Sequence, residues 1–471
     1  MLKREWFKGK RVTIFGLGLN RGALGSIRFL IDSGVKEVIA TDIKTKEELA
    51  PTLKELSSYK NITYVLGQHR SEDFTNVDMV IKNPIFPWTN EYIKLALEHK
   101  IPVEMDASLF TLFSRAPMIG ITGTKGKTTT SSLIAHILEV NKRRIVRVGI
   151  SQIGFLDALE KITPTTTVVA ELSSWRLSSF APHKYSPSVA VVTNIYPDHL
   201  NYYKKMSAYI GDKLNIARFQ KKGDTLVLNY DNEETRGFAS HAKGRIVWFS
   251  ENEFPEGEGI FLRLGTVYER TLTEERVLFP WPKTHLLGEH NRSNILAATA
   301  VARLQAISPE NIVKALESFS GVPHRLEFVG EKDGVKFYND TAATMPEAAI
   351  AGLRSFTKPV VLIAGGADKA FEFESLAKAF VHFPKSVILL KGTATEKLLP
   401  LMQKEALAEG KGEVTFPVMT NMADALQVAY DEAESGDVVL LSPGAASFGL
   451  FQNEFDRGDQ FKQGVKLLLE A

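Results

Sequence analysis

The sequence contains no cysteine, which excludes disulfide bonds, cysteine metal ligands and a cysteine nucleophile. It also lacks an apolar run near the roughly 20 residues that a membrane-spanning helix requires. Neither charge dominates, because the formal net charge is +2 and both signs are mixed along the chain. That balance gives no reason to expect a nucleic-acid partner. The opening stretch, MLKREWFKGKRVTIFGLG, leads from basic residues into a strand pattern and not into a signal-peptide core. We therefore expect a soluble, cytoplasmic protein without a membrane partner.

Short apolar runs alternate with helix-like stretches in three successive series. The first contains RVTIFG, EVIATD and VDMVIKNP, the second restarts at PMIGIT, and the third follows PHRLE. Such alternation predicts parallel sheets flanked by helices. We predict an α/β protein of three domains: an N-terminal Rossmann-like domain (1–114), a central P-loop domain (115–322) and a C-terminal Rossmann-like domain (323–471). Around 245–285 the sequence is charged and strand-like.

The sharpest motif is GTKGKTT, between the apolar run MIGIT and an apolar-periodic helix. Glycines let backbone N–H groups turn toward phosphate oxygens, while a lysine and a threonine offer a charge to phosphates and a hydroxyl to Mg²⁺. The full P-loop pattern needs glycine where Ile121 stands, and an ordinary strand-to-helix turn with a surface lysine is the alternative. The flanking strand and helix favour a nucleotide-phosphate site. We assign to it Gly123, Thr124, Lys125, Gly126, Lys127, Thr128 and Thr129.

Polar residues also follow other strands of the central series. Glu171 ends the run VVAE, where it could hold Mg²⁺ or cap a helix. Asp198 and His199 follow VVTNI in the same way, and ligands of doubly wound sheets bind at such strand ends. Lys213 lies on an amphipathic stretch and taken alone is more typical of a solvated helix face. Asn291 and Asn294 stand three apart at a helix start, where they could cap the helix or bind a base and ribose.

The two outer series contain further ligand-type turns. GLGLNRG (Gly16 to Gly22) resembles a dinucleotide fingerprint, but Arg21 stands where the third glycine belongs, so NAD is not favoured and a structural turn stays open. Asp42 occupies the place of a ribose-binding acid. Arg325 is suited to bidentate hydrogen bonding with a phosphate group. Three glycine-, serine- and alanine-rich loops of the third series suggest a ligand edge, although each could be a tight turn; they place Asp340, Thr344, Lys369 and Ser447 at strand ends.

Taken together, GTKGKTT, ELSSWRL, NIYPDHL, EHNRSN, PHRLE, YNDTAAT and LSPGAASFGLFQNEFDRGDQF resemble the Mur ligase family in order and spacing. The resemblance extends from Gly16 to the last helix. It implies an ATP-dependent amide ligase of peptidoglycan precursor synthesis. ATP would phosphorylate the carboxylate of UDP-N-acetylmuramoyl-L-alanine, and the amine of D-glutamate would attack the acyl phosphate. The implied cofactors are ATP and two Mg²⁺ ions, and the implied state is a monomer.

The resemblance also implies roles for individual residues. The catalytic group would be Lys127, Glu171, His199 and Lys213. The metal ligands would be Thr128, Glu171, His199 and a carbamylated Lys213. The further ATP contacts would be Asn291, Asn294, Arg325 and Asp340. The uridine nucleotide would contact Leu19, Asn20, Asp42 and Lys44. Glutamate would contact Thr344, Lys369, Ser447 and Phe451.

Departures from the family pattern lie mainly around the amino-acid pocket. The loop YNDTAAT has Ala342 where many relatives have lysine, and NEFDRG places its aromatic residue at Phe455. A ligase for L-glutamate or another acceptor, or a folate-type glutamate ligase, therefore stays open. A non-catalytic nucleotide binder is disfavoured because Glu171, His199 and Lys213 are all present. An NAD oxidoreductase is disfavoured by Arg21 together with the phosphate loop.

Overall fold

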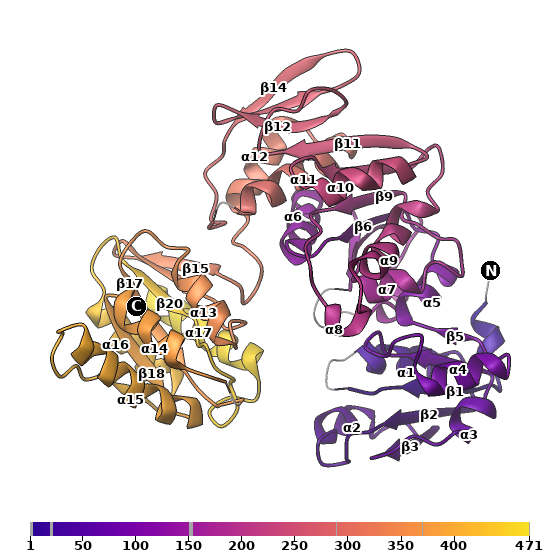
Figure 1. Ribbon diagram of the computed structural model, residues 1–471, viewed down its shortest axis with the longest axis horizontal. Coiled ribbons are helices and arrows are strands. Elements are labelled where there is room, and N and C mark those ends of the chain that lie inside the picture. Colours follow the sequence, from indigo (N-terminus) through magenta and orange to yellow (C-terminus); the bar gives the residue numbers. More distant parts are fainter. Residues whose placement is uncertain (1–2, 19–21, 150–153, 289, 370, 471) are drawn as a thin grey trace. The chain divides into compact units, whose positions relative to one another are not determined.

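The computed structural model describes residues 3–18, 22–149, 154–288, 290–369 and 371–470. The chain forms two compact units (Figure 1). Unit 1 comprises Met1–Pro282 and Arg292–Leu316, and unit 2 comprises Lys283–Asn291 and Glu317–Ala471. Within the residues that the structure describes they contain three sheets, and the α/β class with mostly parallel strands is confirmed. The predicted domain boundaries after residues 114 and 322 stay predictions. Within the described ranges, no helix combines the length and apolar character needed to cross a bilayer.

The first sheet of unit 1 is fully parallel, with the strand order β3-β2-β1-β4-β5. Strand order reverses between β1 and β4, so their carboxyl ends border the crevice where open α/β sheets bind ligands. Its strands are β1 (Arg11–Phe15), β2 (Glu37–Asp42), β3 (Ile62–Leu66), β4 (Met79–Lys82) and β5 (Val103–Glu104). The helices of this part are η1 (Arg4–Phe7), α1 (Gly22–Asp32), α2 (Ala50–Leu56), α3 (Glu72–Thr75), α4 (Glu91–Glu98) and α5 (Asp106–Phe113).

The second sheet of unit 1 has nine strands in the order β14-β13-β12-β11-β10-β9-β6-β8-β7. The residues of β6 are buried throughout, because parallel strands covered by helices on both faces become continuous apolar runs. Its strands are β6 (Met118–Thr122), β7 (Ile145–Val148), β8 (Thr167–Glu171), β9 (Val189–Val192), β10 (Thr225–Asn229), β11 (Arg245–Ser250), β12 (Gly259–Arg263), β13 (Thr266–Arg270) and β14 (Glu275–Pro280). The helices are α6 (Lys127–Val140), η2 (Asp157–Lys161), α7 (Ser174–Ser178), α8 (Leu200–Tyr203), α9 (Met206–Arg218), α10 (Glu233–Gly237), η3 (Phe238–His241), α11 (His290–Leu304) and α12 (Pro309–Ser318). The first two residues of α11 and the last two of α12 belong to unit 2.

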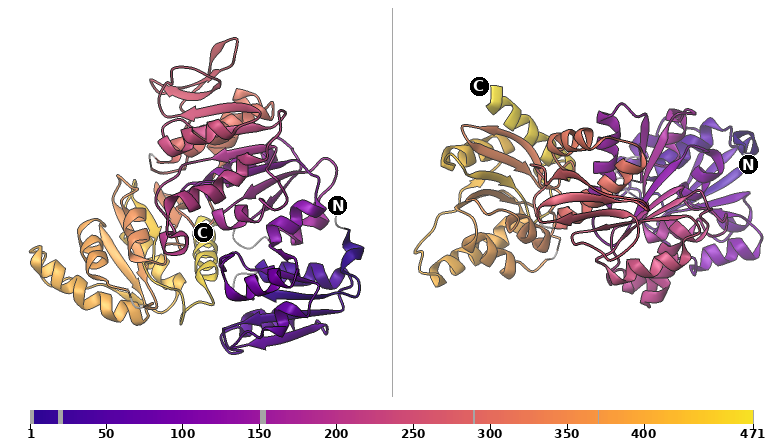
Figure 2. Two further views of the ribbon diagram at one scale, coloured as in Figure 1. Left: turned by 45° about the vertical axis from the view of Figure 1, so that its right-hand side comes forward. Right: turned by 90° about the horizontal axis from the view of Figure 1, so that it is seen from above.

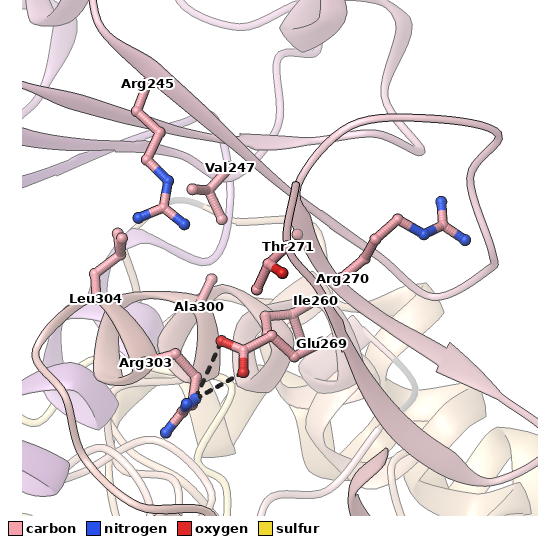
Figure 3. Close-up of a pocket in the computed structure, with 10 residues that line it drawn as sticks. Arg245, Val247, Ile260, Glu269, Arg270, Thr271, Ala300, Arg303 and Leu304 are labelled. Atoms are coloured by element: carbon pink, nitrogen blue, oxygen red, sulfur yellow. Dashed lines mark hydrogen bonds and ion pairs between the residues drawn. The ribbon is translucent and has the colours of Figure 1, made fainter. Parts of the chain in front are cut away.

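Strands β12–β14 form an antiparallel extension of this sheet, and its turns project at the top of Figure 1 and of the left view of Figure 2. Ion pairs attach the extension to the rest of the unit. Glu269 on β13 accepts two hydrogen bonds from Nε of Arg303 on α11, at 3.1 and 3.2 Å (Figure 3). The cavity beside this pair measures about 40 Å³, which is room for water but not for a substrate. This cavity is therefore not a candidate substrate site.

Unit 2 is built on a sheet with the order β15-β16-β20-β17-β18-β19, in which only the β15–β16 pairing is antiparallel. Alternate residues of β17 enter two cores: Leu362 joins one, and Val361 and Ile363 join the other. Its strands are β15 (Glu327–Lys332), β16 (Val335–Asn339), β17 (Val360–Gly365), β18 (Ser386–Leu390), β19 (Val418–Met419) and β20 (Val438–Leu441). The helices are α13 (Pro346–Leu353), α14 (Glu374–His382), α15 (Thr393–Ala408), α16 (Met422–Glu432) and α17 (Glu454–Glu470).

Candidate active site

The predicted phosphate loop connects β6 to α6. Gly126 precedes the first residue of α6 and has a φ of 80°, a left-handed conformation that favours glycine. A Cβ atom at Gly126 would lie 2.3 Å from Oδ1 of Asn294, so a side chain there would displace the loop. The first N–H groups of α6 have no partner within the helix and form the positive end of its dipole. This geometry suits an anion such as a nucleotide phosphate.

Lys127, the first residue of α6, folds back over the loop. Its Nζ donates to the backbone oxygens of Gly123 and Thr124, both at 3.0 Å. The loop is also fixed from β9, because Thr193 Oγ1 donates to the oxygen of Lys125 at 2.6 Å. Lys127 is thus located at the loop where the sequence pattern predicts it.

The side chain of Lys213, on α9, also contacts the phosphate loop. Its side chain is 1% exposed, and its Nζ donates to the oxygen of Gly123 at 2.8 Å and lies 3.3 Å from Thr122 Oγ1. Burial lowers the pKa of Lys213 well below its ordinary value, and the like charge of Lys127 lowers it further. Asp198 and Glu171 oppose this shift. The expectation of a solvated surface lysine is therefore wrong, and the amine is favoured in its neutral, nucleophilic form.

Glu171 ends β8, and His199 lies in the loop after β9; these two strands flank β6 on either side. Glu171 closes β8, which pairs with β6 so that Ile121 lies opposite Glu171. His199 precedes α8 with a φ of 54°, and its ring centroid lies 4.8 Å from that of Trp175. Asp198 lies beside it, with 3.8 Å between Oδ2 and the histidine Nε2. The negative charges of Glu171 and Asp198 both act to raise the pKa of Lys213 against the effect of burial.

Tyr209 is a member of this cluster that the sequence patterns did not single out. Its hydroxyl lies 3.0 Å from Thr124 Oγ1 in the phosphate loop, and Nζ of Lys213 lies 4.8 Å from its ring centroid. Tyr209 stands four residues before Lys213, one helical turn away on the same face. That spacing is the signal that could have identified it.

The predicted metal site has less direct support than the phosphate loop. Across the described ranges, no three His, Asp or Glu side chains converge in a manner suited to a metal ion. The donor chemistry nevertheless suits Mg²⁺, which prefers oxygen ligands: Thr128 has a hydroxyl and Glu171 a carboxylate. The ion, its number and the ligand set of Thr128, Glu171, His199 and Lys213 stay predictions.

The two asparagines of α11 have different hydrogen-bond partners. Asn294 Oδ1 accepts a hydrogen bond from Thr130 Oγ1 at 3.1 Å, so Asn294 packs against α6. Asn291 Nδ2 donates to the oxygen of Leu287 at 2.6 Å, in the turn that precedes the helix. Both side chains are buried. Their contact with ATP stays a prediction.

Asp42 closes β2 in the first sheet and organises the glycine turn after β1. Its Oδ2 accepts from the N–H of Gly18 and its Oδ1 from the N–H of Lys44, both at 3.0 Å. Gly18 follows β1, whose carboxyl end borders the switch of strand order where a nucleotide is expected. Leu19 and Asn20, the other predicted uridine contacts, lie outside the described residues.

In unit 2, Asp340 follows β16 and Arg325 precedes β15. Asp340 Oδ2 accepts from Ser442 Oγ at 2.8 Å, and its Oδ1 accepts from the N–H of Leu326 at 3.2 Å. Burial raises the pKa of Asp340 to about 7, although these hydrogen bonds and the charge of Arg325 oppose the shift. The Arg325 side chain is exposed. The structure thus places Asp340 and Arg325 in one electrostatic neighbourhood.

The predicted glutamate residues lie at the carboxyl ends of three adjacent strands of unit 2. Thr344 follows β16, Lys369 follows β17, and Ser447 follows β20. Backbone hydrogen bonds join these loops, from Gly444 to Ala343 (2.8 Å) and between Ala367 and Ala446 (2.8 and 3.0 Å). Phe451 packs in the core with β17 and β20. Among the described residues, the exposed aromatic side chain near Lys369 is Phe448, whose ring centroid lies 5.5 Å from Nζ.

Two family models match the chain. The Mur ligase middle domain matches residues 121–302, which include the phosphate loop, Glu171, His199 and Lys213. The glutamate ligase domain of the Mur ligases matches residues 324–444, which include Arg325, Asp340, Thr344 and Lys369.

Relatives and solved structures agree with these matches. A UDP-N-acetylmuramoylalanine–D-glutamate ligase of Roseiflexus sp. (strain RS-1) is 40% identical, covering 97% of this chain and 98% of the relative. A ligase of the same name from Borreliella afzelii (strain PKo) is 36% identical, covering 99% and 100%. The crystal structure of UDP-N-acetylmuramate-alanine ligase from Thermotoga maritima has the same fold, with a TM-score of 0.57 at 19% identity over 98% of this chain and 100% of that one. With these matches spanning nearly its whole length, the chain belongs to the Mur ligase family.

Proposed function

We propose that this protein is an ATP-dependent ligase that joins D-glutamate to UDP-N-acetylmuramoyl-L-alanine in peptidoglycan precursor synthesis. The observation that carries the proposal is the cluster at the phosphate loop, where Lys127 and the buried Lys213 both bond the oxygen of Gly123. The near full-length similarity to ligases of that name supports the choice of substrates. The protein acts in the cytoplasm, where ATP and the nucleotide-linked precursor are made.

The reaction follows from the chemistry of a carboxylate, which is a poor electrophile. Its oxygen attacks the γ-phosphorus of ATP, and ADP leaves, which gives an acyl phosphate. The uncharged amine of D-glutamate then attacks the acyl carbon, and the tetrahedral intermediate loses a proton from nitrogen and expels phosphate as the amide forms. The protein needs no nucleophile of its own, so positioning and charge neutralisation carry the catalysis.

The residues of the phosphate loop hold and neutralise the reacting phosphates. The N–H groups at the start of α6 bind the phosphate oxygens, and Lys127 turns from the backbone oxygens of its own loop to the β- and γ-phosphates. Mg²⁺, bound through Thr128, Glu171 and His199, would neutralise the charge that develops on the phosphates.

We propose further that Lys213 is carbamylated. In carbamylation an uncharged amine adds to the carbon of CO2 and loses a proton to solvent, and burial beside Lys127 favours the uncharged form. The product is an anionic oxygen ligand, which would replace a buried amine with a group suited to a divalent cation.

The test is phosphate release by the purified protein with ATP, UDP-N-acetylmuramoyl-L-alanine and a panel of D- and L-amino acids. Release that requires the muramoyl nucleotide and is fastest with D-glutamate is the expected result. ATP hydrolysis at the same rate without the nucleotide would refute the proposal. Turnover with L-glutamate alone would keep the ligase chemistry but change the acceptor.

A further inference from the structure

Arg457 is a fully buried cation in unit 2 that none of the assigned roles explains. It lies on the first turn of α17 and is 0% exposed. Among the described residues, it is the largest side chain that is fully buried. Its three hydrogen bonds go to neutral oxygens: Nε to Thr341 Oγ1 (2.9 Å), Nη2 to the backbone oxygen of Thr341 (3.0 Å) and Nη1 to that of Ala445 (3.2 Å). A residue so placed holds the loop after β16 to the loop after β20.

The loop after β17 also lies close to the guanidinium of Arg457. A Cβ atom at Gly366, which follows β17, would lie 3.4 Å from Nη1 of Arg457 and 2.2 Å from the oxygen of Ala446. The guanidinium therefore bonds two of the three loops that carry Thr344, Lys369 and Ser447, and lies close to the third.

Gly458 allows α17 to approach this closely. A Cβ atom at Gly458 would lie 2.4 Å from Nδ1 of His324 and 2.5 Å from Cγ2 of Thr341. Thr341 Oγ1 in turn donates to the backbone oxygen of Glu454 at 2.9 Å, which ties the start of α17 to the same loop. The sequence pair Arg457-Gly458 thus combines a close helix approach with a cation at the contact.

The charge of Arg457 has no carboxylate counterpart at ion-pair distance in the described part of the chain. Asp459 pairs with Lys462 at 3.1 Å, and Asp456 accepts from the N–H of Gln452. Burial lowers the pKa of Arg457 to about 10, and attraction from Glu454 opposes that shift, so the group stays charged at neutral pH. Buried charges are ordinarily paired, because an unpaired charge loses its hydration without compensation. The three oxygens give each nitrogen of the guanidinium one acceptor but leave its positive charge in place.

We propose that Arg457 is a positioning residue for the amino-acid substrate, fixing the three loops at the carboxyl ends of β16, β17 and β20 and adding positive charge beneath them. The ligand that this arrangement favours is an anionic amino acid with two carboxylates, as in glutamate. The inference rests on the proposed function and extends it to a residue that acts through its neighbours.

The experiment compares wild type, Arg457→Met and Arg457→Lys as full-length proteins. Steady-state phosphate release gives kcat and the KM values for D-glutamate, ATP and the muramoyl nucleotide. We expect Arg457→Met to raise the KM for D-glutamate about tenfold or more, while the other two KM values change less than about twofold. Arg457→Lys keeps the charge but not the planar fork, so its KM for D-glutamate should fall between those of wild type and Arg457→Met.

The matched control is Lys466→Met, which removes one positive charge from the exposed face of the same helix. It should leave all three KM values unchanged. If Arg457→Met does not fold, as judged by circular dichroism, the comparison passes to Arg457→Lys and Arg457→Gln, which keep most of the side-chain volume.

Two results would overturn the role of Arg457. One is an unchanged KM for D-glutamate in a folded variant without the charge. The other is an equal rise in all three KM values that the lysine variant does not reverse. A residue with a purely structural role would give that result. Wild-type protein that fails to use D-glutamate at all would instead overturn the proposed function, so the two failures are distinguishable.

Discussion

Lys213 offers the most direct test at the scale of single residues. The Lys213→Ala variant removes both the amine and any carbamate formed on it, and we expect kcat to fall about 10²–10³-fold, as when one charge-stabilising group is lost. Short carboxylic acids such as acetate fit the space vacated by the side chain and should restore part of the activity. Phosphate release with and without acetate is the measurement.

The control for Lys213 is Lys222→Ala, at an exposed lysine outside α9. It should show normal activity and no response to acetate. Near-normal activity of Lys213→Ala without any acid would show that no carbamate is needed.

Lys82 gives a pH prediction for the folded state. It ends β4, is 1% exposed, donates to the oxygen of Phe86 at 2.9 Å, and lies 4.7 Å from the ring centroid of Trp88. Burial lowers its pKa to about 7, against attraction from Asp212 and Asp106. An unfolded lysine stays protonated to about pH 10.4, so between these values the unfolded state binds more protons than the folded one. The free energy of unfolding should therefore rise with pH, by at most about 1.4 kcal/mol per unit.

Replacement of Lys82 by methionine should remove this rise. The measurement is urea unfolding between pH 6.5 and 9.5, and the quantity of interest is the difference in slope between wild type and variant. Lys54→Met, at an exposed lysine of α2, should keep the wild-type slope. Parallel curves for wild type and Lys82→Met would contradict the assignment.

At the scale of elements, the β12–β14 extension depends on Glu269. Burial alone would raise the pKa of Glu269, but hydrogen bonds from Arg303 and Arg276 hold it below its ordinary value. This contribution to stability is present above the unfolded pKa of Glu269 and is lost as the pH falls through the folded one. Arg303→Met leaves Glu269 with two hydrogen bonds from Arg276, at 2.9 and 2.6 Å, and we expect the unfolding free energy at pH 7 to fall by about 1–3 kcal/mol.

Hydrogen exchange locates this effect. Amides of β13 and β14 should exchange faster in Arg303→Met, while those of β6 and β9 keep their protection. The control is Arg276→Met, which removes a more exposed partner of the same carboxylate and should have the smaller effect. Equal protection of β13 in wild type and Arg303→Met would show that the pair does not hold the extension.

The sequence predicts some elements better than others, for a physical reason. The strand, glycine turn and helix around Gly126 are encoded within a few consecutive residues, so local patterns were enough. The burial of Lys213 was not predictable in that way, because its acceptor Gly123 lies 90 positions away in the sequence. Arg457 bonds Thr341 across 116 positions, and its place near a helix start is typical of a surface residue. The strand-like character expected around 245–285 is confirmed by β11–β14, but the antiparallel pairing of β12–β14 joins separate segments and could not be assigned from local patterns.

At the scale of the whole molecule, the two compact units have separate hydrophobic cores and different optical probes. The core of unit 1 contains Leu226, and one core of unit 2 contains Leu362. All five tryptophans occur at or before position 281 and therefore belong to unit 1. Tryptophan fluorescence thus reports the unfolding of unit 1, whereas far-ultraviolet circular dichroism reports the helices and strands of both units.

A cavity in the core of unit 2 should separate these two signals. Leu362→Ala, at a fully buried position of β17, should destabilise unit 2 by about 2–5 kcal/mol. A domain of 150–250 residues loses about 2–4 °C in midpoint per kcal/mol, so part of the dichroism transition should move to lower temperature while the fluorescence midpoint stays in place. Leu226→Ala, the same change in β10 of unit 1, should lower the fluorescence midpoint. If Leu362→Ala lowers both midpoints equally, the units unfold as one cooperative body, and ligand-induced stabilisation measured by tryptophan fluorescence would then report binding anywhere on the chain.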